Sequence, residues 1–389
     1  MLSLAAKVTR RFRALREQRR QRIQLSPLYS PDAGDLDAER HLQAALEWLK
    51  RAQDSGKDRG VAYGVPFGGD FDVSYPETTG YICRTFIERE RTSGDAELLR
   101  RAVEMGDWEI TVQLPEGAVM GGKLNAHPTP AVFNTGMVLL GWAALIERTG
   151  AVRYQHAAAR ACEWLVSMQE SDGRWLRGNS RFANPEWTLY NVKAAWGLCE
   201  AGVRLGERRY VDAALRNAEY CLSRQHPNGW LPDCCVLDAR APLLHTLAYA
   251  MQGLMGIARL TGREDLILGA RRLADAQMQL MRPDGFIPGK QRADFSGAAD
   301  WCCLTGSAQT SVVWSQLYQL TRDDRYREAV RRINRYLIAR HDIRNADLRL
   351  RGGLPGSWPV WGEYGRHSIL NWATKFLVDA LALEQQISE

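Results

Sequence analysis

Glycine recurs along the sequence with a period of 56 residues, and this regularity constrains the fold more than any other feature. One series is Gly117, Gly173, Gly229 and Gly285, and a second series is Gly94, Gly150, Gly206 and Gly262. Two interleaved series with one period indicate a chain that is built from repeated structural units.

The two glycine series mark two kinds of connection between helices. Residues 169–175 read Q-E-S-D-G-R-W and follow the amphipathic stretch RYQHAAARACEWLVSMQ, which is typical of a helix that ends at a glycine turn. Short connectors such as RTGA and RLGE lie between an apolar stretch and the next amphipathic one. Each unit is therefore an outer helix, a long loop, an inner helix and a short loop.

The sequence contains six such units. Outer helices are expected near 37–54, 96–113, 152–169, 208–225, 264–281 and 324–341, and inner helices near 75–92, 130–148, 186–204, 243–260, 304–320 and 367–386. The inner stretches are apolar almost all round, which is typical of buried helices, whereas the outer stretches have one polar face. Six helical hairpins with a buried inner ring predict an all-α (α/α)6 barrel, a single toroid over residues 30–389; an open helical solenoid is the alternative.

The positive charge of the chain belongs to its first 25 residues. Residues 1–25 carry eight Lys or Arg and one Glu, whereas the whole chain has a net charge of +6. The rest is therefore nearly neutral, which argues against a nucleic-acid-binding surface. Leu4, Val8, Phe12 and Leu15 recur at helical spacing, which predicts a basic amphipathic segment that contacts an anionic membrane or a protein partner.

The sequence contains no apolar stretch long enough for a membrane-spanning helix, and residues 1–25 lack the apolar core of a secretory signal. We therefore expect a cytoplasmic protein that can associate peripherally with the inner membrane. The adjacent pairs Cys234-Cys235 and Cys302-Cys303 lack the spacing of zinc ligands, and we expect neither a metal nor another cofactor.

The long loops all lead into the N-termini of the inner helices, at one rim of the expected barrel, and long loops on a rigid scaffold commonly carry function. Carboxylates, histidines, amides and aromatic rings gather there. This combination suits a sugar, whose apolar faces stack on rings and whose hydroxyls need donors and acceptors. The residues expected to bind substrate are Asp70, Tyr75, His127, Asn134, Arg181, Glu186, Asn191, Trp301, Trp358, Asn371 and Lys375.

Hydrolysis is one chemistry that fits this rim. It needs a protonated carboxyl group and a second carboxylate, and we expect Glu77 or Asp72 to act with Asp300. A competing interpretation of Glu77 is structural, because Ser74 precedes it at the spacing of a capping box.

Elimination or epimerisation at a uronic acid is the other chemistry that fits. It needs a base for the C5 proton, and the candidates are Tyr364, Tyr190 and His245. It also needs donors for the sugar carboxylate, which Arg181, Asn134 and Asn191 could supply. The sequence does not choose between the two chemistries.

The segments SYPETTGYI, WCCLTGSAQTSVVW and GSWPVWGEYGRHSILNWATKFLVDAL resemble the VpsJ-type proteins of bacterial exopolysaccharide biosynthesis. The resemblance covers nearly all of the chain after about residue 30, and this family in turn resembles the six-hairpin glycosidase and α/α-toroid group. It implies a role beside polysaccharide assembly. The positions that match are Tyr75, Glu77, Thr78, Thr79, Cys303, Thr305, Gly306, Gln309, Asn371, Trp372 and Lys375.

These observations predict a carbohydrate-active enzyme that acts on an oligo- or polysaccharide by hydrolysis, β-elimination or epimerisation. One alternative is a non-catalytic glycan-binding or scaffold component of a polysaccharide assembly complex. A third possibility is a terpenoid cyclase-like enzyme, because the Q-x-x-x-G-x-W turn also resembles the repeat of those enzymes. The aspartate-rich D-x-D-D acid motif of one cyclase class is missing, since residues 70–74 read D-F-D-V-S.

Overall fold

The computed structural model describes residues 4–180, 183–236 and 238–388. The outer helices are α2 (Ala38–Asp54), α4 (Ala96–Val112), α6 (Val152–Met168), α8 (Arg208–Ser223), α10 (Glu264–Leu280) and α12 (Asp324–Ile338). The inner helices are α3 (Pro76–Ser93), α5 (Val132–Thr149), α7 (Val192–Leu205), α9 (Leu244–Thr261), α11 (Leu304–Thr321) and α13 (Asn371–Ser388). A further helix, α1 (Leu4–Leu25), precedes them.

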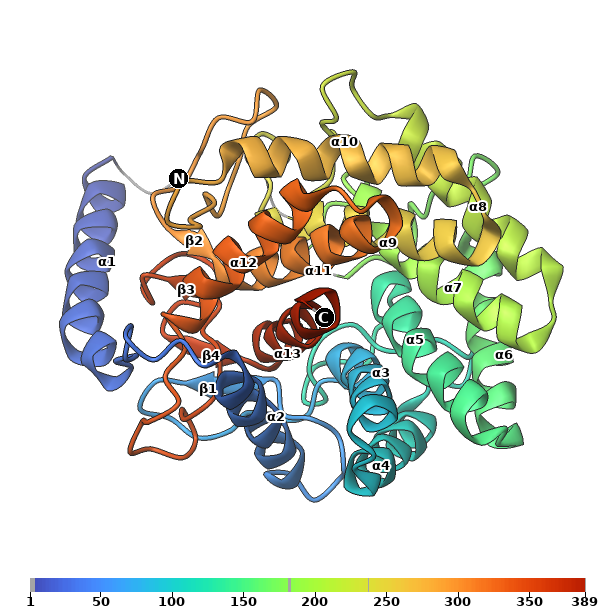
Figure 1. Cartoon of the computed structure of the whole chain (residues 1–389), viewed down its shortest axis with the longest axis horizontal. Coiled ribbons are helices and arrows are strands. Elements are labelled where there is room, and N and C mark those ends of the chain that lie inside the picture. The colour runs from blue at the N-terminus through green and yellow to red at the C-terminus, as the bar shows by residue number, and fades with distance from the viewer. Residues whose placement is uncertain (1–3, 181–182, 237, 389) are drawn as a thin grey trace.

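The six inner helices form a closed ring. Each packs against the next in chain order, and α13 also contacts α3, so that the last hairpin meets the first (Figure 1). The fold is therefore the predicted (α/α)6 barrel, and the open solenoid is wrong. The C-terminal end of α13 lies near the middle of the molecule in this view, on the face where the inner helices end.

A pair of hydrogen bonds from one glutamine side chain holds each of several glycine turns that follow the outer helices. Gly173 has a φ of 90°, and a Cβ atom there would lie 2.5 Å from the carbonyl oxygen of Arg216 on the next outer helix. Gln169 Nε2 donates to the carbonyls of Gly173 (3.1 Å) and Ala213 (2.9 Å), so that one amide joins the turn to that helix. Gln113 and Gln225 make the same pair of hydrogen bonds in their own units.

The second glycine series ends inner helices, as predicted. Gly94, Gly150, Gly206 and Gly262 have φ angles of 72°, 67°, 70° and 73° and cap the C-termini of α3, α5, α7 and α9. In the fifth hairpin Arg322 takes the same left-handed position with a φ of 56°. The short connectors therefore lie together at one end of the barrel.

Some inner helices begin later than the sequence predicted, because extended or 3-10 backbone precedes them. The helix α7 was expected from residue 186, but a 3-10 turn, η2 (Leu189–Asn191), comes first. The helix α13 was expected from residue 367, but residues Ser368–Leu370 form strand β4, which pairs antiparallel with β1 (Gly64–Pro66). A second two-stranded ladder joins β2 (Cys302–Cys303) to β3 (Ser357–Trp358). Both ladders fasten long loops to the rim where the inner helices begin.

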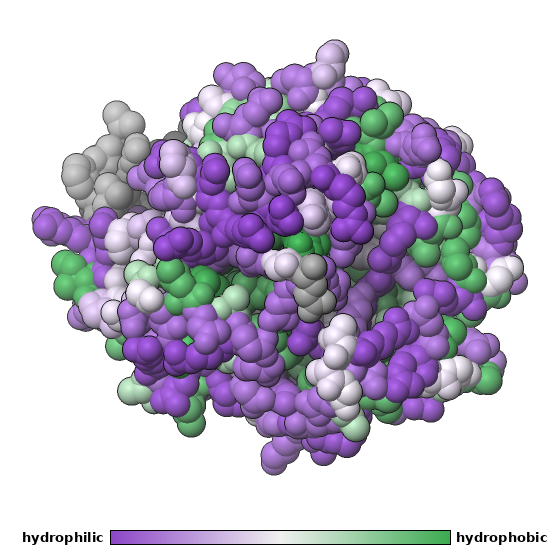
Figure 2. All heavy atoms as spheres, in the orientation of Figure 1, coloured by the Kyte–Doolittle hydropathy of each residue, from purple (hydrophilic) through white to green (hydrophobic). Residues whose placement is uncertain are grey.

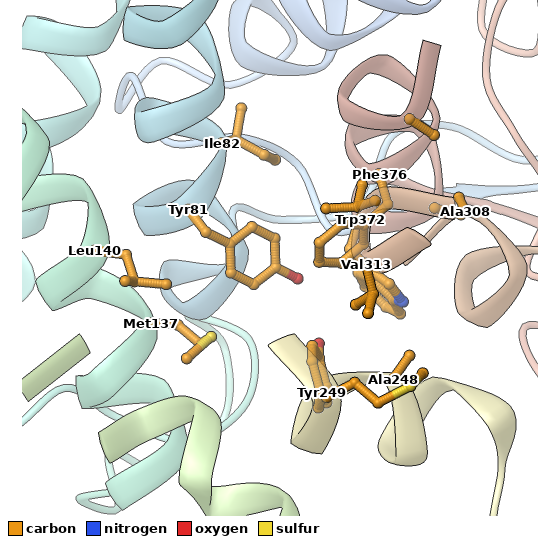
Figure 3. Packing of buried hydrophobic residues seen from close by; sticks show 14 of the residues in the cluster. Tyr81, Ile82, Met137, Leu140, Ala248, Tyr249, Ala308, Val313, Trp372 and Phe376 are labelled. Atoms are coloured by element: carbon orange, nitrogen blue, oxygen red, sulfur yellow. The ribbon is translucent and has the colours of Figure 1, made fainter. Parts of the chain in front are cut away.

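The core fills the space between the helices. Figure 3 shows side chains from several inner helices pointing into it, among them Tyr81 from α3, Tyr249 from α9 and Phe376 from α13. Tyr81 and Tyr249 point into the same space between the helices (Figure 3), and both are buried. Aromatic and aliphatic groups thus close the centre of the barrel below the long-loop rim.

The N-terminal helix α1 lies at the edge of the barrel (Figure 1). Its end is joined to a rim loop: the Arg22 guanidinium lies 3.7 Å from the centre of a Trp361 ring, and Ser26 Oγ is 3.3 Å from His367 Nε2. Ser26 belongs to a short 3-10 turn, η1 (Ser26–Leu28). The side chains of residues 1–13 and 15 lie outside the described part, so the apolar stripe of Leu4, Val8, Phe12 and Leu15 stays a prediction. None of the helices in the described ranges is long and apolar enough to cross a membrane.

Candidate active site

Eight aromatic side chains follow one another around the long-loop rim, and we call them the aromatic collar. In order they are Tyr75, Tyr63, Trp372, Tyr364, His245, Tyr249, Phe133 and Tyr190. Successive rings lie 4.2 to 5.4 Å apart between centroids, except that Trp372 Nε1 and the Tyr364 hydroxyl are joined by a 2.7 Å hydrogen bond. Inner helices or the loops leading into them supply every member, so that the barrel itself positions the collar.

Glu77 is the carboxyl group that belongs to this collar. It sits in the first turn of α3, is 9% exposed, and its Oε2 accepts a 2.5 Å hydrogen bond from the Tyr75 hydroxyl. Burial raises the pKa of Glu77 to about 7, while the hydrogen bond from Tyr75 and the charge of Lys193 oppose this rise. A carboxyl group with such a pKa can both give and take a proton at neutral pH.

The capping-box interpretation of Glu77 is wrong. The N-cap of α3 is Tyr75, whose backbone is extended, and it makes no side-chain capping bond. Ser74 Oγ instead donates to Asp58 Oδ1 (2.9 Å) in the preceding loop. The carboxyl group of Glu77 is therefore not used to cap its helix.

A chain of amides crosses three inner helices and orients His245. Lys193 Nζ on α7 donates to Gln252 Oε1 on α9, and Gln309 Nε2 on α11 donates to the same oxygen at 3.3 Å. Gln309 therefore presents Oε1 to His245 Nδ1, 2.6 Å away, which places the proton of the neutral imidazole on Nδ1. Nε2 keeps its lone pair and can accept a hydrogen bond.

Burial lowers the pKa of His245 to about 3, and the nearby Lys193 charge adds to this effect, while Gln309 opposes it. The imidazole is therefore neutral at physiological pH. Since α3 and α9 lie opposite each other in the ring of six, Glu77 and His245 approach the collar from opposite sides. Each precedes a buried tyrosine by four residues, about one helical turn: Glu77 precedes Tyr81, and His245 precedes Tyr249.

The other carboxylates expected to act in catalysis lie farther out. Asp72 is partly exposed and forms an ion pair with Lys123, whose ammonium also lies 5.1 Å from the centre of the Tyr63 ring. Asp300 is exposed on its loop. Within the described chain, the carboxyl group of Glu77 accepts its hydrogen bond from Tyr75 and is not paired with a second carboxyl group.

Three of the predicted binding residues are exposed to solvent, and a fourth lies outside the described residues. The Asp70 side chain is 88% exposed and pairs with Arg349 at 2.5 Å. His127 and Glu186 are exposed on their loops, and Arg181 lies outside the described residues. Their exposure distinguishes Asp70, His127 and Glu186 from the buried collar.

The predicted asparagines are buried in or just before the first turns of inner helices. Asn371 Nδ2 donates to the carbonyl of Ala62 and to Thr78 Oγ1 (both 2.8 Å), so this amide holds the rim loop. Asn191 Nδ2 donates to Asn179 Oδ1 at 3.2 Å. Both polar atoms of the Asn134 amide are buried and have no hydrogen-bond partner among the described residues. Asn134 therefore keeps its full donor and acceptor capacity.

The remaining predicted residues divide between the rim and the interior. Trp301 is buried, and Trp358 is half-buried in strand β3. Lys375 was expected at the rim, but this placement is wrong: it lies in the second turn of α13 and forms an ion pair with Asp379. It lines a cavity that opens at the other end of the barrel. Its position follows from helix periodicity, since one turn separates it from Asn371.

Several collar residues, and Lys193 beside the Tyr249 ring, escaped the sequence analysis. Tyr63, Phe133, Tyr249 and Lys193 were not selected, although each lies in a loop or turn that the repeat brings to the inner ring. The spacing of four residues between Glu77 and Tyr81, and between His245 and Tyr249, was the available signal, because residues four apart share one helix face.

Among the described residues no group of three His, Cys, Asp or Glu side chains could hold a metal ion. The eight cysteines are buried and form no disulfide bond. Burial raises the pKa of Cys303 to about 12, so that this thiol stays protonated.

No protein-family model matches the sequence. A search of curated proteins likewise finds no match. Among solved structures, the chain is similar to an unsaturated glucuronyl hydrolase specific for heparin, with a TM-score of 0.73, 15% identity, and coverage of 90% of this chain and 97% of that one. It is also similar to a D-mannose isomerase (TM-score 0.68, 12% identity, 92% and 100% covered) and to cellobiose 2-epimerase from Bacillus thermoamylovorans (TM-score 0.69, 10% identity, 88% and 98% covered).

These similarities confirm the (α/α)6 barrel. The similar structures named here are carbohydrate-processing enzymes: a uronide hydrolase, an isomerase and an epimerase. At this level of identity the similarity establishes the fold, and the chemistry has to be argued from the collar itself.

Proposed function

We propose that the protein is a carbohydrate-active enzyme in which Glu77 transfers a proton to and from a sugar carbon. The observation that carries the proposal is a buried carboxyl group with a pKa of about 7, held by Tyr75 inside the aromatic collar. Elimination, epimerisation and isomerisation of sugars all require such a group.

The proposed step removes a proton from a carbon next to a carbonyl or carboxylate group of the sugar. The Glu77 carboxylate takes this proton, and the electron pair of the C–H bond moves toward the carbonyl oxygen. The protonated Glu77 then returns the proton to the neighbouring carbonyl carbon, which gives an isomer as the hydroxyl proton moves to the other oxygen, or to the oxygen that leaves in an elimination. An epimer requires that the proton return on the opposite face of the sugar, from a second acid. No redox partner is needed, since electrons and atoms balance within the sugar.

The surrounding polar groups suit the charge that develops in this step. Asn134 has no hydrogen-bond partner among the described residues and can donate to a developing oxyanion. His245 Nε2 is a lone-pair acceptor for a sugar hydroxyl, because Gln309 holds the proton on Nδ1. The collar supplies ring faces for the C–H face of the sugar.

Hydrolysis by two carboxyl groups receives less support from this geometry. Asp72 is engaged by Lys123, and Asp300 is exposed, so neither is a partner of Glu77 in the collar. Glycan binding without catalysis and terpenoid cyclisation are the further alternatives. A pKa near 7 on a buried acid favours proton transfer over both.

Three segments of the sequence resemble exopolysaccharide biosynthesis proteins. This resemblance supports a substrate that is a building block or a product of an exopolysaccharide. We propose that residues 1–25 add attachment to an anionic membrane surface or to a protein partner. Their net charge of +7, from eight Lys or Arg and one Glu, and the contact of Arg22 with Trp361 at the rim support this part of the proposal.

The test is incubation of the protein in D2O with reducing and uronic oligosaccharides, read by mass spectrometry, NMR and absorbance of unsaturated uronates. Wild type is compared with Glu77→Gln and with Glu116→Gln, an exposed turn glutamate, as matched control. We expect carbon-bound deuterium or an unsaturated product from wild type and the control, and a loss of about 10²-fold or more in Glu77→Gln. Hydrolysis without carbon-bound deuterium, or unchanged turnover in folded Glu77→Gln, would overturn the proposal.

A further inference from the structure

A cavity opens at the end of the barrel opposite the collar, where the inner helices end. Its volume is about 480 Å³, which is within the range of small-molecule sites. Residues of all six inner helices line it, and its deepest members, Tyr81, Lys193 and Phe376, lie in the second or first turns of their helices. The cavity therefore penetrates from the short-connector face almost to the underside of the collar.

The lining of this cavity is strongly cationic. Six basic side chains line it, whereas the acidic residues there are Glu88 and Asp379. The basic residues are Arg84, Arg89, Arg91, Lys193, Arg259 and Lys375. Figure 2 shows that the surface around the end of α13 is mainly hydrophilic.

Not all of these cations are neutralised by neighbouring carboxylates. Arg84 pairs with Glu88 and Glu200, and Lys375 pairs with Asp379. Arg259, by contrast, lies 3.7 Å from the already paired Glu200, and its side chain is 56% exposed. A cation at the mouth of the cavity is thus available to a ligand.

Lys193 is the buried amino group on the collar side of the cavity. Burial, together with the charge of Lys375, lowers its pKa well below the ordinary value, so an anion bound beside it would favour its charged form. Lys193 is 2% exposed, and within the described chain its one hydrogen-bond acceptor is Gln252 Oε1. The rings of Tyr249 and Phe376 each lie 4.8 Å from its Nζ, and these ring faces partly compensate the charge. An ammonium group has three N–H donors, so Lys193 retains donors that a ligand oxygen could accept.

Apolar side chains complete the walls between Lys193 and Arg259. Trp196, Met255 and Val312 line the cavity beside Gln252 and Gln316. A ring face, amides, a deep amino group and the guanidinium of Arg259 together suit a compact molecule with one apolar face, several hydroxyls and an anionic group.

We propose that this cavity is a binding site for a small sugar-like oxyanion, whose anionic group pairs with Arg259 at the mouth while Lys193 donates to an oxygen deeper in the cavity. This site opens at the other end of the barrel from the collar, which it adjoins at Lys193, and the proposal does not depend on the chemistry proposed for Glu77. Phosphate and carboxylate share the recognising chemistry, so the experiment distinguishes them.

The test uses three ligands with one ring and different charges: glucose, glucuronate and glucose 6-phosphate. Binding to the full chain is measured by isothermal titration calorimetry at low and at raised salt. We expect glucose 6-phosphate or glucuronate to bind at least ten-fold more tightly than glucose, and more weakly at raised salt. Equal affinities for the neutral and the charged sugars would overturn the proposal.

Variants locate the binding site. Arg259→Gln should weaken binding of the charged sugar about five-fold or more, whereas Arg240→Gln, an arginine that is 92% exposed on a distant loop, should leave it unchanged. Glu77→Gln should also leave it unchanged, because Glu77 belongs to the collar. Loss of binding in Glu77→Gln with retention in Arg259→Gln would place the anion in the collar and overturn the proposal, independently of whether Glu77 proves catalytic.

Discussion

The hydroxyl of Tyr75 donates a 2.5 Å hydrogen bond to Oε2 of Glu77, two residues later in the chain. The bond stabilises the carboxylate and thus lowers the pKa of Glu77, while burial raises it by more. The pKa of about 7 is the balance of these two effects. Because the donor and acceptor flank Pro76, the start of α3 fixes their relative position.

Replacing Tyr75 by Phe should raise the pKa of Glu77 further. The ring stays in the collar, but the carboxylate loses its hydroxyl donor, and a hydrogen bond to a charged group is worth roughly 1.5–3 kcal/mol. We expect the midpoint of the pH–rate profile that reports Glu77 to rise by about one pH unit or more. Tyr220→Phe, a tyrosine on outer helix α8, is the control. An unchanged midpoint would show that the hydrogen bond does not tune Glu77.

The buried Glu77 should make the protein less stable as the pH rises. Its pKa is about 7 when folded and 4.5 when unfolded, so the folded chain binds the extra proton between these values. The contribution of Glu77 to the free energy of unfolding is fully present below about pH 4.5 and is lost as the pH rises through about 7. Over this range the free energy of unfolding falls by roughly 3 kcal/mol. Glu77→Gln should remove this slope in urea unfolding experiments between pH 5 and 8. Parallel curves for wild type and variant would contradict the prediction.

A buried pair of histidines should make the protein less stable as the pH falls. His41 Nδ1 and His341 Nδ1 lie 2.9 Å apart, and burial, with the charge of His41, lowers the pKa of His341 to about 3. The unfolded chain takes up this proton below about pH 6.5, so stability falls as the pH decreases, by roughly 1.4 kcal/mol per unit. His341→Asn should reduce the acid sensitivity of the unfolding free energy between pH 6.5 and 5, with exposed His156→Asn as control.

Two glycines with similar backbone angles should respond differently to alanine. At Gly150 the φ is 67° and a Cβ would have no atom within 4 Å, so Gly150→Ala should cost about 1 kcal/mol of backbone strain. At Gly173 the φ is 90° and the Cβ would lie 2.5 Å from the Arg216 carbonyl oxygen, which adds a clash with backbone that cannot easily move. We expect Gly173→Ala to cost about 2 kcal/mol more in chemical denaturation. Equal losses would show that the turn adapts.

Removing residues 1–21 should abolish attachment without unfolding the barrel. This deletion takes away seven of the eight basic residues of the segment but keeps Arg22 and Ser26, which contact the rim. We expect the full chain to sediment with vesicles containing anionic lipid, less so at raised salt, and the shortened chain to stay in solution with an unchanged Tm. Equal sedimentation of both chains would refute the role proposed for the segment.

The repeat made the fold predictable because its signals are local. A glycine that must adopt positive φ, such as Gly94 or Gly150, marks the end of a helix wherever the rest of the chain lies. The periodicity of apolar residues then separates buried from half-buried helices. The prediction erred where backbone pairing decided the outcome, as at Ser368–Leu370, whose extended conformation depends on a strand about 300 residues away in the sequence.

The candidate site was only partly predictable for the same reason. Glu77, Tyr75, His245, Tyr190 and Tyr364 were selected because they stand at the expected starts of inner helices or in the loops there, and the structure brings them into one collar. Tyr63, Phe133 and Lys193 were missed, since nothing local distinguishes them from core residues. Asp300 and Asp72 resemble Glu77 in sequence terms, but burial separates them from it.

Local patterns in the chain were enough to predict the number of hairpins, their order and the rim to which the chemically active residues belong. These properties follow from backbone preferences and from periodic burial, which act over a few residues. The protonation of Glu77, the tautomer of His245 and the placement of Lys193 between the collar and the basic cavity depend instead on the assembled barrel. Desolvation and hydrogen bonding set these properties, and both depend on which side chains from distant parts of the chain surround the group.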